Sequence, residues 1–383
     1  MSKGNLTLIF NHFEFELEHL GKDVFLIPYY LGKQLEYDVT IVYPRTTTNG
    51  DIPEYLNGVQ LIPLRYRKNI PLIPIWQHVN FYIYLLKHVK TINVLMRFHL
   101  SVHTELMSIF YKKLNRNGKV YVKLDTNGEG LEATYGDLKL SLRRLIHRWV
   151  EASFIRNTDC LSCETYIAFQ RLKKYHYSQL QFGDKLQLLS NGFDEELLQS
   201  LDFQERRFGE KENLIITVGR IGSPEKNTEM FLRALTKINL QNWQVCLIGP
   251  IDPRIEEAIQ NFFITNPDKQ ESVKFKGAIY DKKELWEYYN RAKVFVLTSD
   301  WESYALVLNE AKRLRNYIVS TDVGACRDII ENEKYGMSIP VNDDAMLAKA
   351  LNDIVSGKQD IDVYEGYDMN DLSWQTQIKK LKL

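Results

Sequence analysis

The chain has 383 residues, of which 44% are hydrophobic and 26% charged, so it is too long for one small domain and too apolar for a disordered protein. Its 49 Lys and Arg residues balance its 49 Asp and Glu residues. Because a net charge of zero gives no general attraction to a polyanion, the composition argues against nucleic acid as a partner.

Short β-branched runs alternate with longer amphipathic stretches along the first half of the chain, a pattern typical of α/β proteins. The expected strands are 6–10, 38–43, 60–63, 94–98, 119–124 and 159–163, and the expected helices include 24–36 and 104–114.

The second half shows a separate run of the same kind. Its expected strands are 214–218, 243–248, 273–276, 294–297 and 317–320, and its helices are 228–237, 283–291, 306–314 and 344–355. A polar stretch without a strand pattern, 195–212, lies between the two runs. The sequence therefore predicts two doubly wound α/β domains with a cleft between them, and ligands in such sheets bind at the carboxyl ends of the strands.

The N-terminus and the cysteines indicate a cytoplasmic protein. The first residues enter a strand pattern without the apolar core and cleavage site of a signal peptide, and the longest apolar stretch, 70–86, is shorter than the roughly 20 residues of a membrane span. Four Cys residues are too few for a disulfide scaffold. Cys160 and Cys163 form a single C-x-x-C with no second pair nearby, so a buried strand is favoured over a zinc site.

Two segments of the second half carry residues suited to a phosphorylated ligand. Gly219 and Arg220 directly follow an expected strand, and Lys226 precedes a helix. Two cations at the carboxyl end of a strand suit a diphosphate, although this loop alone would also fit a solvated turn. Glu302 and Glu310 form an E-x7-E pair, in which Glu310 lies about 12 Å further along the chain if the rise is helical. The backbone N–H groups of 303–306, at the start of that helix, attract phosphate oxygens.

The blocks VGRIGSPEKN, KFKGAIYDKKELWEYYNRAKVFVLTSDWESYALVLNEA and STDVGACRDII resemble the retaining glycosyltransferases of glycosyltransferase family 4. The resemblance extends over most of the second half, including LLSNGFD and the terminal DLSWQTQIKKLKL. It implies the GT-B fold, with two Rossmann-like domains facing a central cleft. The N-terminal acceptor-binding domain would be 1–205, the nucleotide-sugar-binding domain 206–365, and the C-terminal helix 366–383 would pack back on the N-terminal domain.

The resemblance also assigns roles to individual residues. It implies that Arg220 and Lys226 bind the donor diphosphate, that Glu310 binds the ribose, and that Glu302 contacts the transferred sugar as a catalytic residue. The full donor-binding set that it implies is Gly21, Gly219, Arg220, Lys226, Ala278, Ile279, Ser303, Tyr304, Ala305, Leu306 and Glu310.

Three sites depart from the family pattern. Relatives commonly have Glu-Gly-Phe-Gly where this chain has Ser303 and Ala305 in place of the two glycines. Relatives also have paired glycines before the first helix, where this chain offers only Gly21. Asp125 follows the strand 119–124 at the place where relatives often carry a His, and we expect Asp125 to act as a catalytic residue there.

These assignments predict a retaining hexosyltransferase that moves a sugar from a nucleotide-diphosphate donor, in the first instance a UDP-sugar, to a glycan, lipid-linked or protein acceptor. Synthesis of a bacterial cell-surface polysaccharide or glycoconjugate is the expected setting. Cations and a helix N-terminus stabilise the charge that grows on the leaving diphosphate, so no cofactor and no metal are expected. A nucleotide-sugar epimerase or hydrolase, or a non-catalytic partner of another transferase, is the alternative.

Two segments of the first half combine cations with apolar residues and raise the question of membrane contact. LKLSLRRLIHRWVEASFIR alternates Arg143, Arg144 and Arg148 with apolar positions, and 64–90 joins a cationic cluster to Trp76, Phe81 and Tyr82. Each segment is predicted either to pack its apolar face on a sheet or to contact the inner face of a membrane peripherally, and both interpretations stay open here.

Overall fold

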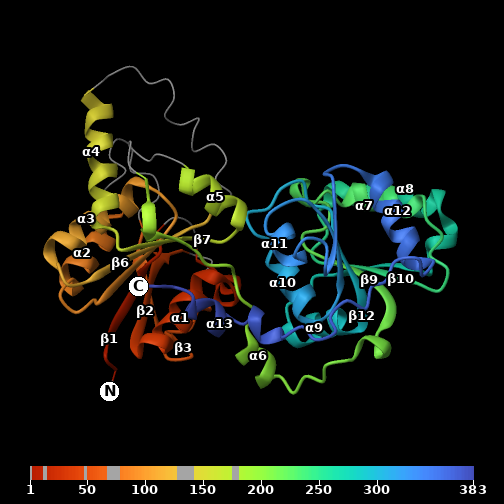
Figure 1. Ribbon diagram of the computed structural model, residues 1–383, viewed down its shortest axis with the longest axis horizontal. Helices are drawn as coiled ribbons and strands as arrows, with labels where there is room; N and C mark the ends of the chain where they lie inside the picture. Colours follow the sequence, from red (N-terminus) through yellow and green to blue (C-terminus); the bar gives the residue numbers. More distant parts are fainter. Residues whose placement is uncertain (1, 12–14, 47–49, 67–77, 127–141, 175–180) are drawn as a thin grey trace. The chain divides into compact units, whose positions relative to one another are not determined.

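The computed structural model describes residues 2–11, 15–46, 50–66, 78–126, 142–174 and 181–383 (Figure 1). The chain folds into two compact units, Met1–Gly192 with Trp374–Leu383, and Phe193–Ser373. The boundaries between the two units therefore follow Gly192 and precede Trp374. The sequence predicted domain boundaries after residues 205 and 365. The functional role of each domain stays a prediction.

The first unit is built on a sheet whose strand order is β3-β4-β2-β1-β5-β6-β7-β8. All its strands are parallel except the short β3, which pairs antiparallel with β4 at the edge. The strands are β1 Gly4–Ile9, β2 Tyr37–Arg45, β3 Tyr55–Leu56, β4 Val59–Arg65, β5 Val94–Phe98, β6 Lys119–Leu124, β7 Cys160–Cys163 and β8 Leu186–Leu188. The order reverses direction between β1 and β5, which defines the switch point of this sheet.

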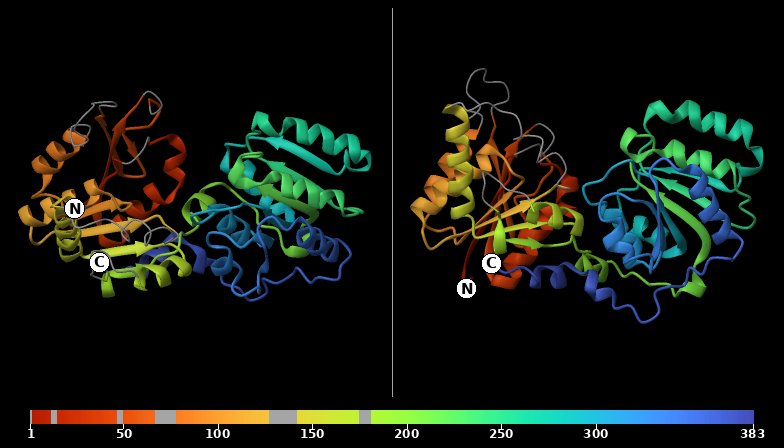
Figure 2. Two further views of the ribbon diagram at one scale, coloured as in Figure 1. Left: turned by 90° about the horizontal axis from the view of Figure 1, so that it is seen from above. Right: turned by 45° about the horizontal axis from the view of Figure 1, so that its top comes forward.

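Helices cover both faces of this sheet (Figure 2). Two clusters of buried side chains fill the space between the helices and the sheet. The helices are α1 Asp23–Leu35, α2 Val79–His88, α3 Val102–Leu114, α4 Leu142–Asn157, α5 Tyr166–Lys174 and α13 Trp374–Lys379, with the 3-10 turns η1 Leu17–Gly21 and η3 Gly183–Lys185.

The last helix of the chain, α13, packs against α1 in the first unit (Figure 1). Its Trp374 is fully buried, and a Cβ added to Gly192 would lie 2.6 Å from the backbone of Trp374. Gln187 of β8 also exchanges two hydrogen bonds with the backbone of Lys382, at 2.7 and 2.8 Å. The C-terminal helix that the sequence predicted is therefore confirmed as part of the first unit.

The second unit is a parallel sheet with the order β11-β10-β9-β12-β13-β14. The strands are β9 Glu212–Val218, β10 Gln244–Ile248, β11 Val273–Gly277, β12 Ala292–Leu297, β13 Tyr317–Thr321 and β14 Gly336–Ile339. This is the order of a Rossmann fold, with its switch point between β9 and β12.

Helices again lie on both faces, over two buried clusters of apolar side chains. They are α6 Glu195–Ser200, α7 Thr228–Thr236, α8 Glu256–Thr265, α9 Lys282–Arg291, α10 Leu306–Arg313, α11 Cys326–Ile330 and α12 Asp344–Val355. The 3-10 turns are η4 Phe208–Glu210, η5 Pro224–Lys226, η6 Pro253–Ile255, η7 Pro267–Lys269 and η8 Met369–Leu372. The two doubly wound sheets predicted from the sequence are confirmed.

For one of the two segments considered for membrane contact, the structure supports the packing interpretation at Phe81. Phe81, on α2, is fully buried in the first unit, and Tyr82 is half-buried. Trp76 lies outside the described residues. Across the described ranges, no helix is both long and apolar enough to cross a bilayer.

Candidate functional site

The residues predicted to bind the donor phosphates meet at the switch point of the second sheet. Arg220 and Lys226 follow β9, and Glu302 follows β12. Because β9 and β12 are hydrogen-bonded neighbours and parallel, their carboxyl ends open at the same edge. A pocket at this edge is lined by Gly219, Arg220, Lys226, Thr228 and Thr298, among others.

A close backbone approach fixes the start of the loop after β9. The N–H of Gly219 donates to the carbonyl of Ile248 at 3.0 Å, and a Cβ added to Gly249 would lie 1.7 Å from the carbonyl oxygen of Gly219. The φ of Gly249 is also +145°. Only glycine fits at position 249, so the carboxyl ends of β9 and β10 are held together at the mouth of the pocket.

Lys226 and Glu302 form an ion pair, although they are far apart in the sequence. The hydroxyl of Ser299 donates to the same carboxylate oxygen at 2.6 Å. Both side chains of the pair are mostly buried. The cation predicted for the diphosphate therefore lies beside the carboxylate predicted for the sugar, as one ligand spanning both would require.

Arg220 behaves differently from Lys226. Its guanidinium pairs with Glu225 of the same loop, and its side chain is 69% exposed. It therefore lies at the rim of the pocket, next to solvent.

The position of Lys226 depends on contacts that the sequence did not point to. Lys226 is the last residue of η5, and its carbonyl accepts a hydrogen bond from the Thr298 hydroxyl at 3.0 Å. The next residue, Asn227, adopts φ +43° and donates to Asp300 at 2.7 Å. The N–H of Asp300 in turn donates to the carbonyl of Glu225 at 2.8 Å. These bonds join the two loops on which Lys226 and Glu302 stand.

The structure corrects the start of the helix after Glu302. Of the four residues 303–306, only Leu306 belongs to α10, because Ala305 has φ +74° and interrupts the helical backbone. Ser303 and Tyr304 lie in the preceding turn, where the Tyr304 carbonyl accepts from the N–H of Ala325 at 2.8 Å. Ala305 thus keeps the left-handed conformation that the glycine of relatives would adopt without strain.

We expect Ala305→Gly to raise the free energy of unfolding by up to about 1 kcal/mol, measured by urea denaturation. The left-handed conformation costs alanine about 1–2 kcal/mol, and the greater freedom of glycine in the unfolded chain offsets about 0.4–1 kcal/mol of the gain. Ala258→Gly within α8 is the matched control and should lower stability by about 0.5–1 kcal/mol. Equal destabilisation by both changes would contradict a strained Ala305.

Glu310 lies on α10 and faces α9. It accepts hydrogen bonds from Lys282 Nζ at 2.7 Å and from Trp286 Nε1 at 3.1 Å, neither of which the sequence singled out. Ala278 and Ile279 are half-buried in the loop between β11 and α9. The residues predicted for the ribose and the base therefore belong to neighbouring elements.

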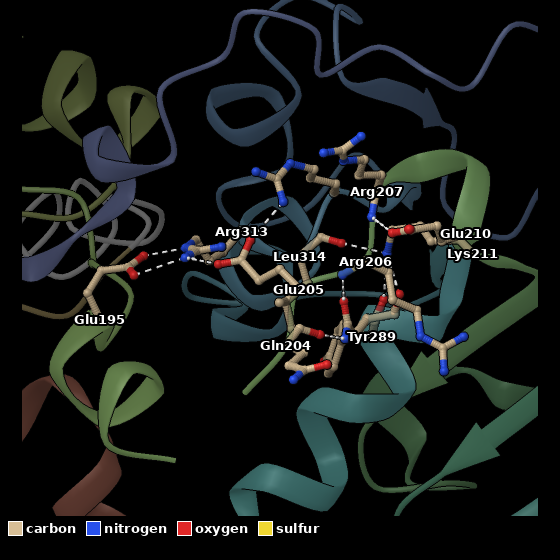
Figure 3. Close-up of polar contacts among 12 residues, drawn as sticks. Glu195, Gln204, Glu205, Arg206, Arg207, Glu210, Lys211, Tyr289, Arg313 and Leu314 are labelled. Atoms are coloured by element: carbon tan, nitrogen blue, oxygen red, sulfur yellow. Dashed lines mark hydrogen bonds and ion pairs between the residues drawn. The ribbon is translucent and has the colours of Figure 1, made fainter. Parts of the chain in front are cut away.

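A buried network holds α9 and α10 together at their carboxyl ends (Figure 3). Lys211 Nζ donates to the carbonyls of Tyr289 at 3.1 Å, Asn290 at 2.8 Å, Ala292 at 3.0 Å and Leu314 at 2.8 Å. One ammonium group thus caps the helix that carries Glu310 and the helix that carries its hydrogen-bond donors.

Arg313, at the end of α10, extends this network to the segment before β9. Its guanidinium pairs with Glu195 and with Glu205, the latter at 2.7 Å (Figure 3). The paired charges are mostly shielded from water, so breaking one of them would leave the others uncompensated.

Gly21 and Asp125 lie in the first unit. Gly21 ends η1, just before α1, and Asp125 follows β6. Asp23 of α1 pairs with Lys123 of β6, which is fully buried and also pairs with Glu164. Burial lowers the pKa of Lys123 and the two carboxylates raise it, with the net result well above its ordinary value. A fixed positive charge therefore lies close to Asp125 in the chain.

His99 is the residue near Asp125 that the sequence did not reveal. It follows β5 with φ +58°, and its Nδ1 lies 4.0 Å from the Asp125 carboxylate. Burial lowers the pKa of His99. An imidazole is thus present beside Asp125, supplied by the neighbouring strand.

Residues 199–365 match the family model "Glycosyl transferases group 1". The amylovoran biosynthesis glycosyltransferase AmsD of Erwinia amylovora is 25% identical over 158 residues, which are 40% of this chain and 41% of that protein. The chain thus matches about two-fifths of that relative's length.

Two solved structures share the fold over the whole chain. Sucrose-phosphate synthase from Thermosynechococcus elongatus has a TM-score of 0.68 at 18% identity, covering 99% of this chain and 97% of its own. The Anabaena protein HepE in complex with UDP has a TM-score of 0.67 at 12% identity and covers 98% of both chains. The two Rossmann-like sheets match those of GT-B glycosyltransferases, and residues 199–365 belong to the glycosyl transferases group 1 family.

Proposed function

We propose that the protein transfers a sugar from a UDP-sugar to a glycan, lipid-linked or protein acceptor with retention of the anomeric configuration. The observation that carries this proposal is the pairing of Lys226 with Glu302 at the switch point of the second sheet, with Glu310 on the following helix. HepE, which shares the fold, was solved with UDP and with UDP-glucose. Synthesis of a cell-surface polysaccharide is proposed from the amylovoran relative.

The residues of the site would bind different parts of the donor. Lys226, with Arg220 at the rim, would bind the diphosphate and stabilise the negative charge that grows on it as the glycosidic bond breaks. Glu302 would bind the sugar hydroxyls, and Glu310 the ribose. Retention requires either attack on the face that the diphosphate leaves or a covalent intermediate, and we assign no residue to a nucleophilic role. Asp125 and His99 would act on the acceptor side.

The test is a panel of nucleotide sugars assayed for stabilisation and turnover in the presence of excess EDTA. We expect UDP-sugars to raise the melting temperature and to be turned over without added metal. We also expect Arg220→Ala to weaken UDP binding, measured by calorimetry, because its positive charge acts in both the ground and the transition state. Turnover that is lost in EDTA and restored by magnesium would contradict the phosphate site as assigned.

The alternatives predict different results in the same assays. An epimerase or hydrolase would convert the donor fully without any acceptor, and a non-catalytic partner would bind no donor. Either outcome would overturn the proposed transfer.

We further propose that the protein is cytoplasmic and contacts an anionic membrane surface through α4. Leu145, Ile146 and Trp149 on this helix are 52%, 57% and 57% exposed, and Lys113 of α3 lies over the Trp149 ring at 5.7 Å. Arg148 lies between Ile146 and Trp149 in the sequence of α4, so this helix carries apolar and cationic residues close together. Helices that bind at a membrane interface have the same combination.

We expect the double variant Leu145→Gln, Trp149→Gln to bind vesicles containing phosphatidylglycerol about tenfold or more weakly than the wild type. Burying each of these side chains in the interface is worth about 1.5–3 kcal/mol. Co-sedimentation measures the effect, and Ile264→Gln on α8, where Ile264 is 75% exposed in the second unit, is the control. Equal binding of all three proteins would refute the contact.

A further inference from the structure

The switch point of the first sheet holds a buried cation that the proposed chemistry does not use. Arg97 lies on β5, and Asn11 lies just beyond the end of β1, the neighbouring strand. Both side chains are buried, and Arg97 is 0% exposed. Ligands of doubly wound sheets bind outside the carboxyl ends of the strands at this point of the topology.

The guanidinium of Arg97 is only partly satisfied. It donates to the carbonyl of Ile9 through one terminal nitrogen and to Asn11 Oδ1 through the other. Its Nε has no hydrogen-bond partner, and among the described residues no carboxylate pairs with Arg97. Burial lowers the pKa of Arg97 to about 9. A buried, uncompensated guanidinium is costly, and an oxyanion is the ligand that would remove the cost.

Further polar groups surround Arg97 at the same edge. Asn11 Nδ2 lies 3.0 Å from His78 Nδ1, and the rings of His78 and His103 have centroids 4.0 Å apart. The hydroxyl of Tyr82 lies 3.3 Å from His103 Nδ1. These residues come from the end of β1, from α2 with the residue before it, and from α3, so different elements converge on one polar cluster.

The same cluster is positively biased. Burial, together with the charges of His103 and Arg97, lowers the pKa of His78 to about 4, and burial and Arg97 also lower the pKa of His103. After burial, the positive charge of Arg97 is a cause of both shifts. A bound anion would offset that charge.

From these contacts we infer that the first unit binds an oxyanion of the acceptor, a phosphate or carboxylate group, through Arg97 with His78 and His103. The inference rests on the proposed function, because it assigns the switch point of the first sheet to the acceptor. It adds that the acceptor is anionic, either a lipid-linked diphosphate or a sugar that carries a carboxylate.

The experiment is calorimetric titration of the full chain with inorganic phosphate while the donor site is saturated with UDP. We expect Arg97→Gln to weaken phosphate binding about tenfold to hundredfold, as for the loss of a hydrogen bond to a charged group. His103 is half-buried and lies on α3, outside the sheet. His103→Gln should therefore weaken phosphate binding several-fold. Arg156→Gln, an exposed arginine at the end of α4, should leave phosphate binding unchanged.

Two further probes distinguish the sources of the anion. Glucuronate reports a sugar carboxylate, and farnesyl diphosphate reports a lipid-linked diphosphate. Tighter Arg97-dependent binding of either one supports the site and identifies the acceptor class.

The inference is overturned if the wild type binds none of the three probes, or if Arg97→Gln and His103→Gln both bind phosphate as the wild type does. If Arg97→Gln fails to fold, the His103→Gln result decides. UDP affinity, measured in the same samples, separates the two proposals: failure to bind UDP contradicts the proposed function, whereas retained UDP binding with Arg97-independent phosphate binding contradicts only this site.

Discussion

Replacing Glu302 by Gln is expected to lower turnover about 10²–10³-fold while leaving UDP affinity unchanged or slightly higher. The change removes a carboxylate assigned to the reacting sugar, and losses of this size follow removal of one preorganised polar group in other active sites. It also releases Lys226 from its ion pair, so the ammonium becomes more available to a diphosphate. Steady-state kinetics with a UDP-sugar and calorimetry with UDP measure the two effects.

Glu310→Gln tests the other end of the same ligand. Glu310 is placed on the ribose, so its loss should weaken UDP binding by about 1.5–3 kcal/mol and should appear mainly in the Michaelis constant. Glu225→Gln, which changes the partner of the exposed Arg220, is the control and should have a small effect on both quantities. If the Glu302 and Glu310 variants showed the same pattern, the donor would not lie along α10 as assigned.

Lys211→Met is expected to lower the free energy of unfolding by about 3–5 kcal/mol. Methionine matches the length of lysine but cannot donate, so four carbonyl oxygens at the ends of α9 and α10 lose their common partner. The carbonyls of Tyr289 and Ala292 keep a hydrogen bond from Asn316 Nδ2, so the loss falls mainly on those of Asn290 and Leu314. Buried polar groups left without a partner cost about 1–3 kcal/mol each. Chemical denaturation of the full chain measures the loss.

Lys237→Met provides the comparison for Lys211→Met. Lys237 pairs with Asp344, and the Lys237 side chain is half exposed. Surface ion pairs of this kind contribute about 0–1 kcal/mol to the free energy of unfolding. If the two variants lost the same stability, the capping role of Lys211 would be wrong.

The sequence by itself determined the class of the fold and most of the strands. Runs such as 214–218 and 294–297 are fully apolar or β-branched, and 94–98 and 119–124 are mostly so, because parallel strands are covered on both faces. The same pattern located the loops at the carboxyl ends of the strands, and with them Arg220, Lys226 and Glu302. It missed β3, β8 and β14, which are short strands at the sheet edges with too few residues to show a period.

The tertiary structure alone decided which of these residues meet. Lys226 and Glu302 become neighbours because β9 and β12, distant in sequence, pair in parallel at a switch point, and no local pattern encodes that pairing. The left-handed backbone of Ala305 and the burial of Phe81 follow from packing against other elements, which overrides local preference. In the sequence alone, Arg97 is a single cation within an otherwise apolar strand. In the fold, β5 pairs with β1, and Arg97 is buried there without a carboxylate partner among the described residues. An unpaired charge is costly in such a buried position.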